Sequence, residues 1–244
     1  MQLRSFFSKV IFMTLACTLC VHHACARIIV SPLRTQFKLK DKPYQDISVF
    51  NQQKDKKSYV GTTLKLIENP GMPNERSIES RNPKEVGLLL TPPKLVLAPN
   101  QRRSIRVSLL KPPGEQERIY RIKVMPVLGQ LKRVAPVSQG EKRLFLRVNV
   151  AFLVELVIPP IKPVAKISAI RNGKSVTVKN IGNTNLLFGK IQQCTSADKC
   201  VETGVTGKRL YAGNTYTFEI PEAGPVSFET VAETLDKKSA GQTN

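Results

Sequence analysis

The sequence predicts an all-β chain that is built from two sandwich domains. Almost every segment alternates apolar and polar residues with a period of two, turn residues separate these segments at short intervals, and no helical stripe continues beyond two turns. The stretch Pro159-Pro160-Ile161-Lys162-Pro163 divides the strands into two groups, because three of its five positions lack a backbone donor. We expect residues 159–163 to form a stiff hinge between the domains.

The first residues of the sequence predict whether the protein is exported. Arg4 and Lys9 form a positive start, an apolar run follows, and Ala24-Cys25-Ala26 has the small residues that a signal peptidase recognises. We therefore expect residues 1–26 to be a cleaved signal peptide and Arg27 to begin the mature chain. The apolar run is shorter than the ~20 residues of a membrane span. An exported protein that is not integrated in the membrane is expected.

The N-terminal domain is assigned to residues 27–158. Seven strands over about 130 residues suit an immunoglobulin-like sandwich. The period-two segments predict strands at 28–38, 45–51, 58–67, 86–90, 103–110, 118–127 and 144–158.

The C-terminal domain is assigned to residues 164–235 and is expected to be a second immunoglobulin-like sandwich. Asn172-Gly173 favours a tight hairpin turn between its first two strands. Residues 236–244 are a polar tail that we expect to be frayed. The predicted strands are 165–170, 175–179, 185–192, 215–220 and 226–231.

The composition argues against catalysis. His22 and His23 are the two histidines of the sequence, and both leave with the signal peptide. Their loss excludes the usual Ser-His and Cys-His nucleophiles and the two-histidine metal helices. We expect no enzyme activity, no metal site and no cofactor.

The charge is strongly positive. The 38 lysines and arginines exceed the 18 aspartates and glutamates by 20, and removal of Arg4 and Lys9 lowers the net charge by two, to +18. Such a charge suggests polyanions. Export argues against nucleic acid, and the basic residues lack the interleaved aromatics of a single-strand binding surface. A solvated basic surface is the favoured interpretation, and a binder of acidic glycans is an alternative.

Cys194 and Cys200 are the cysteines that remain after signal removal. A lone pair so close in sequence in an oxidising compartment is more simply a disulfide than half of a metal site. We expect this bond to contribute about 2 kcal/mol of stability.

The segment 144–158 is the most unusual of the sequence. Leu144, Leu146, Val148 and Val150 place four aliphatic side chains in a row on one face of the expected strand. Periodicity alone favours a position inside the domain's own core. The other interpretation is that these side chains are turned toward a client protein.

Four runs of the first domain form an ordered combination, and they are GLLLTPP at 87–93, LAPNQ at 97–101, SIRV at 104–107 and QERIYRI at 116–122. In the second domain, NIGNT at 180–184 accompanies the Cys194 and Cys200 pair. Together these motifs resemble the PapD-like periplasmic pilus chaperones. The second-domain motifs resemble the alternate branch of that family, which assembles common pili and colonisation-factor fimbriae. The resemblance covers nearly the whole mature chain.

The resemblance implies a periplasmic chaperone that works by donor-strand complementation. Such a chaperone lends a strand to an incomplete fimbrial subunit, which it delivers to an outer-membrane usher. Carried onto this sequence, the donor side chains are Leu144, Leu146, Val148 and Val150. The sequence leaves open whether the free protein covers its exposed edge by self-association. A secreted structural or adhesive immunoglobulin-like protein, such as a fimbrial subunit, is the alternative.

The resemblance also implies a basic pair that holds the terminal carboxylate of the subunit. Arg27 and Arg34 are both candidates for its arginine. Glu155 stands at the position of its lysine, so Arg121 and Lys123 are the other anchor candidates, and each is also a candidate ion-pair partner for Glu155. Arg106 and Glu117 match family positions whose charges form a structural ion pair.

Overall fold

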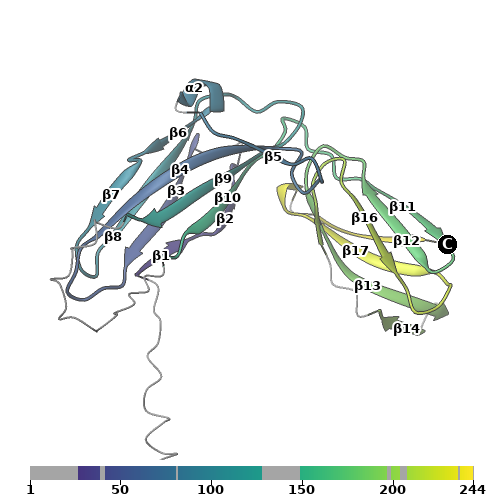
Figure 1. Cartoon of the computed structure of the whole chain (residues 1–244). Helices are drawn as coiled ribbons and strands as arrows, with labels where there is room; N and C mark the ends of the chain where they lie inside the picture. Colours follow the sequence, from purple (N-terminus) through teal and green to yellow (C-terminus); the bar gives the residue numbers. More distant parts are fainter. Residues whose placement is uncertain are drawn as a thin grey trace, which may run out of the picture.

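The chain forms two β-sandwiches that lie at an angle to each other, as Figure 1 shows. A computed structural model describes residues 27–38, 42–80, 82–127, 149–196, 199–203, 208–235 and 237–243. The all-β fold with two immunoglobulin-like sandwiches is therefore confirmed.

Two sheets form the first sandwich. One has the order β1 (Ile28–Ser31), β3 (Tyr44–Asn51), β8 (Arg102–Leu109) and β6 (Leu88–Thr91). The other has the order β2 (Arg34–Gln36), β10 (Phe152–Ile158), β9 (Arg118–Pro126), β4 (Ser58–Glu68) and β5 (Arg76–Ile78), with β7 (Lys94–Leu97) also pairing with β4. Alternate apolar side chains of both sheets fill the space between them.

The predicted first strand, 28–38, is in fact two strands in different sheets. β1 pairs antiparallel with β3, whereas β2 pairs parallel with β10. Pro32 lies between them and has no N–H group with which to continue a ladder. The chain therefore changes sheets at this point, and β1 does not continue along the edge of β10.

The predicted strand at 86–90 begins too early. A short helix, α2 (Pro83–Val86), occupies its first position, and the strand β6 starts at Leu88. Asn82 caps the helix by accepting a hydrogen bond from the backbone N of Lys84 at 3.1 Å. Gly87 ends it with a φ of 83°, a conformation that glycine adopts without strain.

The second sandwich has two smaller sheets. One has the order β11 (Ile167–Asn172), β12 (Ser175–Asn180) and β16 (Thr215–Glu219). The other has the order β14 (Lys199–Glu202), β13 (Leu186–Ser196), β17 (Val226–Ala232) and β18 (Lys237–Thr243), with β15 (Lys208–Leu210) pairing with β13. Phe188 lies at the centre of the core, with ring centroids 4.9 Å from Phe228 and 6.0 Å from Phe218. The predicted hairpin between β11 and β12 is confirmed, but its turn is Gly173-Lys174, because Asn172 still pairs with Ser175.

The prediction of a frayed tail is wrong. After the 3₁₀ turn η2 (Glu233–Leu235), β18 pairs antiparallel with β17 along its whole length, from Val226 opposite Thr243 to Ala232 opposite Lys237. Main-chain hydrogen bonds hold an edge strand whatever its side chains are, so its polar sequence gave no sign of it.

The linker between the sandwiches is fixed to the first domain. Pro159 and Pro160 are buried, and the backbone N of Ile161 donates to the carbonyl of Gly114 at 2.9 Å. Within the described ranges, no helix has the length and apolar character needed to cross a membrane.

Candidate functional site

Of the four predicted donor residues, the structure describes Val150. Leu144, Leu146 and Val148 lie outside the described residues. Val150 precedes β10, is 47% exposed and is not sealed in its own domain. Of the predicted strand 144–158, the structure describes residues 149–158, and in this part the strand β10 begins at Phe152.

The apolar face of β10 runs out of the core at its N-terminal end. Val154, Leu156 and Ile158 are buried in the first core, and Phe152 packs against it while partly buried. Val150 lies two residues before Phe152, outside β10, and is exposed. The exposure of these apolar side chains therefore increases from the middle of β10 toward the segment that precedes it.

One edge of β10 is only partly covered. β2 pairs with Glu155, Leu156 and Val157, and no strand of the described residues pairs with Phe152 through Val154 on that side. The cause is the change of sheet at Pro32, which takes β1 to β3. An open strand edge is where another chain can pair.

The outer face of the same sheet contacts the second domain near the linker. Ile67 of β4, Ile119 of β9 and Val157 of β10 form a small buried cluster with Tyr211, which follows β15 in the second domain. In the same region Nδ2 of Asn214 donates to the carbonyl of Pro70 at 3.0 Å. Apolar and polar contacts together fix this junction.

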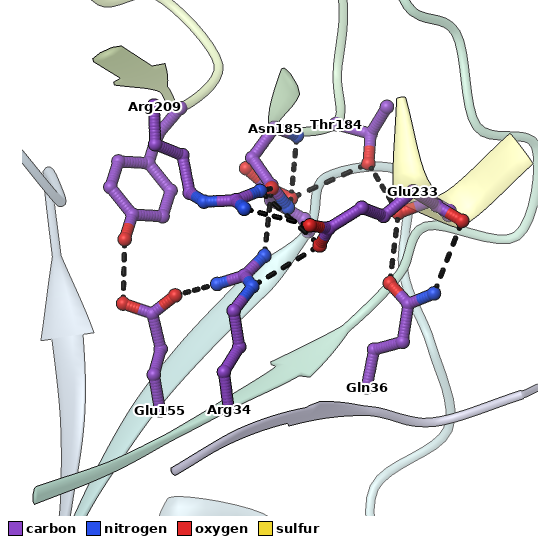
Figure 2. Close-up of polar contacts among 10 residues, drawn as sticks. Arg34, Gln36, Glu155, Thr184, Asn185, Arg209 and Glu233 are labelled. Carbon is purple, nitrogen blue, oxygen red and sulfur yellow. Dashed lines mark hydrogen bonds and ion pairs between the residues drawn. The ribbon is translucent and has the colours of Figure 1, made fainter. Parts of the chain in front are cut away.

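A charged network lies beside that cluster, and Figure 2 shows it. Arg34 of β2 contacts the carboxylate of Glu155 through Nη1 and that of Glu233 through Nε at 3.2 Å. Arg209 of β15 contacts Glu233 through Nη2 at 2.8 Å. Oδ1 of Asn185 accepts from Arg34 Nη2 at 2.9 Å and from Arg209 Nη1 at 2.6 Å. Two guanidiniums, one from each domain, thus share two acceptors.

Glu155 pairs with Arg34 and Tyr211. The Tyr211 hydroxyl donates to Glu155 Oε2 at 2.6 Å. The prediction that Glu155 pairs with Arg121 or Lys123 is therefore wrong. Its two carboxylate oxygens instead accept from Arg34 on the neighbouring strand β2 and from Tyr211 of the second domain.

Burial and the neighbouring charges shift the titration of this network. Burial, followed by the charge of Arg209, lowers the pKa of Arg34. Burial also acts to raise the pKa of Glu233, but hydrogen bonds and charges from Arg209 and Arg34 outweigh it, so that this pKa lies below its ordinary value. Glu233 is therefore ionised at neutral pH and neutralises the repulsion between two guanidiniums.

The predicted Arg106–Glu117 ion pair is wrong. Arg106 lies on the surface and binds Asp46 of β3 through two nitrogens, at 2.9 and 3.0 Å, with its guanidinium over the Tyr44 ring. Arg106 and Asp46 stand opposite each other in the β3–β8 register, which explains the pairing.

Glu117 instead bonds across the junction. Its Oε2 accepts from the backbone N and the side-chain Nδ2 of Asn185, at 2.8 and 2.7 Å. Its Oε1 is buried and has no hydrogen-bond partner among the described residues. Burial raises the pKa of this carboxyl.

The remaining anchor candidates have separate positions. Arg121 binds Glu75 at 2.5 and 3.1 Å, so its guanidinium is already paired. Lys123 stands beside exposed Leu153 in the β9–β10 register and makes no ion pair with a described residue. Arg27 is exposed at the start of β1, on the sheet that does not contain β10. Of these, the structure brings Arg34 alone to the interdomain network.

The cysteine region is described only in part. Cys200 is disulfide-bonded, and its backbone stands opposite Cys194 in the β13–β14 register. This register is compatible with a Cys194–Cys200 bond, which stays a prediction. In the described ranges, no three acidic, histidine or cysteine residues group to hold a metal ion.

Sequence reasoning missed the second-domain half of the junction. Asn183 Nδ2 donates to the carbonyls of Glu115 and Lys162, at 2.8 and 3.0 Å, and so ties its loop to the first domain and the linker. The three asparagines of 180–185 were a usable signal, since buried asparagines generally bond to backbone. Arg209, Tyr211 and Glu233 carried no comparable local signal.

Comparisons with known proteins point to fimbrial systems. No model of a protein family matches the chain. The chain is 26% identical over 197 residues to a protein of Escherichia coli named as a CFA/I fimbrial subunit, covering 79% of this chain and 78% of that protein. It is 23% identical over 206 residues to a second Escherichia coli protein, named as a CS1 fimbrial subunit, covering 82% and 84% of the two chains.

Solved structures give the decisive likeness. The crystal structure of the class 5 fimbriae chaperone CfaA matches with a TM-score of 0.67 and 22% identity, covering 88% of this chain and 97% of that one. This chain has the fold of the fimbrial chaperones. A chain from a chaperone–tip adhesin complex of CFA/I fimbriae biogenesis matches with a TM-score of 0.66 and 21% identity, covering 89% and 98%. The fimbrial-chaperone fold therefore includes both sandwiches and the linker.

Within this fimbrial-chaperone fold, the two features described above lie on the same sheet of the first domain. The open edge belongs to the first three residues of β10, and the charged network begins at Glu155, the middle residue of the strand. One strand therefore carries both an accessible edge and the contact with the second domain.

Proposed function

We propose that this chain is a periplasmic chaperone for fimbrial subunits. It donates the segment before β10 as a strand to a subunit, which it then delivers to an outer-membrane usher. The activity depends on strand pairing and requires no catalytic group and no cofactor.

The open edge of β10 is the observation that carries the proposal. A described strand pairs with Phe152 through Val154 on the β9 side only, and Val150, just before β10, is exposed. A polypeptide with an unfilled groove can pair with such an edge and cover its apolar side chains. Burial of four aliphatic side chains gives a gross gain of order 10 kcal/mol, from which the cost of association is subtracted.

The fold and the relatives support fimbrial subunits as clients. One matched structure is described as a chaperone–tip adhesin complex, and it covers 89% of this chain. Both curated relatives have names from fimbrial systems. We infer that the clients of this chain are the fimbrial subunits that are made with it.

A fimbrial subunit is the second candidate, because both curated relatives are named as subunits. A subunit in need of a donated strand has one incomplete sandwich. This chain has two sandwiches, each with its own core, and resembles a chaperone over 97% of that chaperone's length. The chaperone function is therefore preferred.

Location in the periplasm rests on the expected signal peptide. N-terminal sequencing of the protein from a periplasmic extract is expected to begin at Arg27. A start at Met1, or recovery from the cytoplasm alone, contradicts the proposed compartment.

Subunit capture tests the function. The chain is co-expressed with its subunits as wild type and with Leu146→Asp and Val148→Asp together, and soluble periplasmic subunit is measured after affinity purification. The charged replacements are expected to abolish subunit recovery and leave the chaperone folded, because aspartate cannot fill an apolar groove. The matched control is Ile170→Asp with Val201→Asp, since both residues are exposed aliphatics of the second domain. Normal subunit recovery with the Leu146 and Val148 variant contradicts the proposal.

A further inference from the structure

The guanidiniums of Arg34 and Arg209 meet at one carboxylate. Oε2 of Glu233 accepts from Arg34 Nε at 3.2 Å and from Arg209 Nη1 at 3.3 Å, and its Oε1 accepts from Arg209 Nη2 at 2.8 Å. Both oxygens of Glu233 are therefore held, as Figure 2 shows. Two arginines arranged in this way form a site for a carboxylate.

The two carboxylates of the network differ in how firmly they are attached. Glu155 is 21% exposed, lies within β10 and is bound by both Arg34 and Tyr211. Glu233 is 39% exposed and lies on the three-residue turn η2, after β17 has ended. The Glu233 side chain is able to swing into solvent without breaking a strand, whereas Glu155 is fixed.

We propose that Glu233 is an internal substitute for the C-terminal carboxylate of a bound subunit. In the free protein it occupies the space between Arg34 and Arg209, and the carboxylate of an arriving subunit displaces it. This inference rests on the proposed chaperone function. It adds a second contact with the subunit, in which the subunit carboxylate binds Arg34 and Arg209 after Glu233 has left.

Charge balance supports an exchange of this kind. Arg34 and Arg209 face Glu155 and Glu233, so two positive charges meet two negative charges. Replacement of the Glu233 carboxylate by another keeps this balance and provides the same two acceptor oxygens. Binding without displacement places a third carboxylate beside the first two, which is unfavourable.

The same arrangement explains the role of Glu155 in β10. An acidic residue at this position repels an incoming carboxylate, but Arg34 and Tyr211 already occupy its two oxygens. The second cation of the site comes from Arg209 in β15 of the other domain. A carboxylate bound here therefore contacts both domains.

A peptide titration of the processed protein tests the exchange. The probe is N-acetyl-trialanine with a free C-terminal carboxylate, its control is the same peptide as the C-terminal amide, and binding is followed by NMR at the arginine Nε–H signals. When an internal group occupies a site, the apparent affinity for an added carboxylate is the intrinsic affinity multiplied by the fraction of time that the site is open. Glu233→Gln is therefore expected to bind the carboxylate peptide at least tenfold more tightly than wild type.

A matched variant controls for the change of net charge. Glu219 is an exposed glutamate of β16 in the same domain, and Glu219→Gln is expected to bind the peptide with wild-type affinity. The amide peptide is expected to bind none of the three proteins. Equal affinity of wild type and Glu233→Gln for the carboxylate peptide overturns the inference, as does binding of the amide peptide with the same affinity.

The capture assay separates this inference from the proposed function. If Leu146→Asp with Val148→Asp abolishes capture while Glu233→Gln leaves peptide affinity unchanged, the chaperone function stands and the exchange is wrong. If that donor variant captures subunits normally, the chaperone function is wrong whatever the peptide result.

Discussion

Tyr211 and Glu155 join the two domains by a hydrogen bond of 2.6 Å from the tyrosine hydroxyl to Oε2 of the carboxylate. The ring of the same tyrosine packs on Ile67, Ile119 and Val157 of the first domain. One side chain thus takes part in both the apolar and the charged contacts of the junction.

Tyr211→Phe is expected to lower the unfolding free energy by about 2 kcal/mol, because a hydrogen bond to a charged acceptor is lost while the ring contacts remain. Calorimetry of the whole chain measures this change. The control is Tyr216→Phe, since the Tyr216 ring packs in the second core and no hydrogen bond of its hydroxyl is found among the described residues. Equal losses in both variants contradict a special role for the Tyr211 hydroxyl.

Glu117→Gln is expected to change the pH dependence of stability. Because burial raises the pKa of Glu117 above its ordinary 4.5, the folded chain retains a proton there at pH values where the unfolded chain has released it. The contribution of Glu117 to stability is therefore greatest below its unfolded pKa and is lost as pH rises through the folded pKa. Glutamine removes this loss, so the variant gains stability relative to wild type from pH 4 toward pH 7 in urea unfolding.

Glu75→Gln provides a control of opposite sign for that experiment. Hydrogen bonds from Arg121 and from the backbone of Gly71 lower the pKa of Glu75, so its contribution is present above the unfolded pKa and is lost as pH falls. A stability difference between Glu117→Gln and wild type that does not vary with pH contradicts the interpretation of Glu117.

Gly182→Ala is expected to destabilise the chain by about 2–3 kcal/mol, a typical cost of overpacking. A Cβ at this position lies 2.1 Å from the Val164 carbonyl oxygen and 2.9 Å from the Lys166 nitrogen, and both are backbone atoms of the segment after the linker. Relief of the clash moves the loop that contains Asn183 and Asn185, so subunit capture is also expected to decrease.

Gly114→Ala is the matched control, because a Cβ there meets no atom within 4 Å. It is expected to keep wild-type stability and capture. A thermal melt of both variants makes the comparison, and equal melting temperatures for the two alanine variants contradict the expected clash at Gly182.

Arg27→Ala is expected to leave subunit capture unchanged, because Arg27 lies at the start of β1 on the sheet opposite to β10. Arg34→Ala is expected to reduce capture, since it removes a guanidinium that two acidic groups and Asn185 share. Co-purified subunit measures both effects. Loss of capture with Arg27→Ala, or full capture with Arg34→Ala, reverses this assignment.

The sandwich fold was predictable because the core strands carry their own period-two pattern. The strands 45–51, 103–110 and 118–127 lie within one residue of β3, β8 and β9. The strands at the sheet edges were harder to predict than these core strands. β18 is held by main-chain bonds to β17, and β1 and β2 are separated by Pro32, so their side-chain patterns did not predict how they pair.

The sequence alone determined the class of fold, the two domains, the alternating apolar face of the predicted segment before the linker and the lack of histidine beyond His23. These properties follow from the order of neighbouring residues. The tertiary structure decided the partners of the charges. Arg34 meets Glu155 and Glu233 from positions 121 and 199 residues away in sequence, and Arg106 meets Asp46 instead of Glu117. Ion pairs depend on which surfaces the folded domains bring together, and no local pattern contains that information.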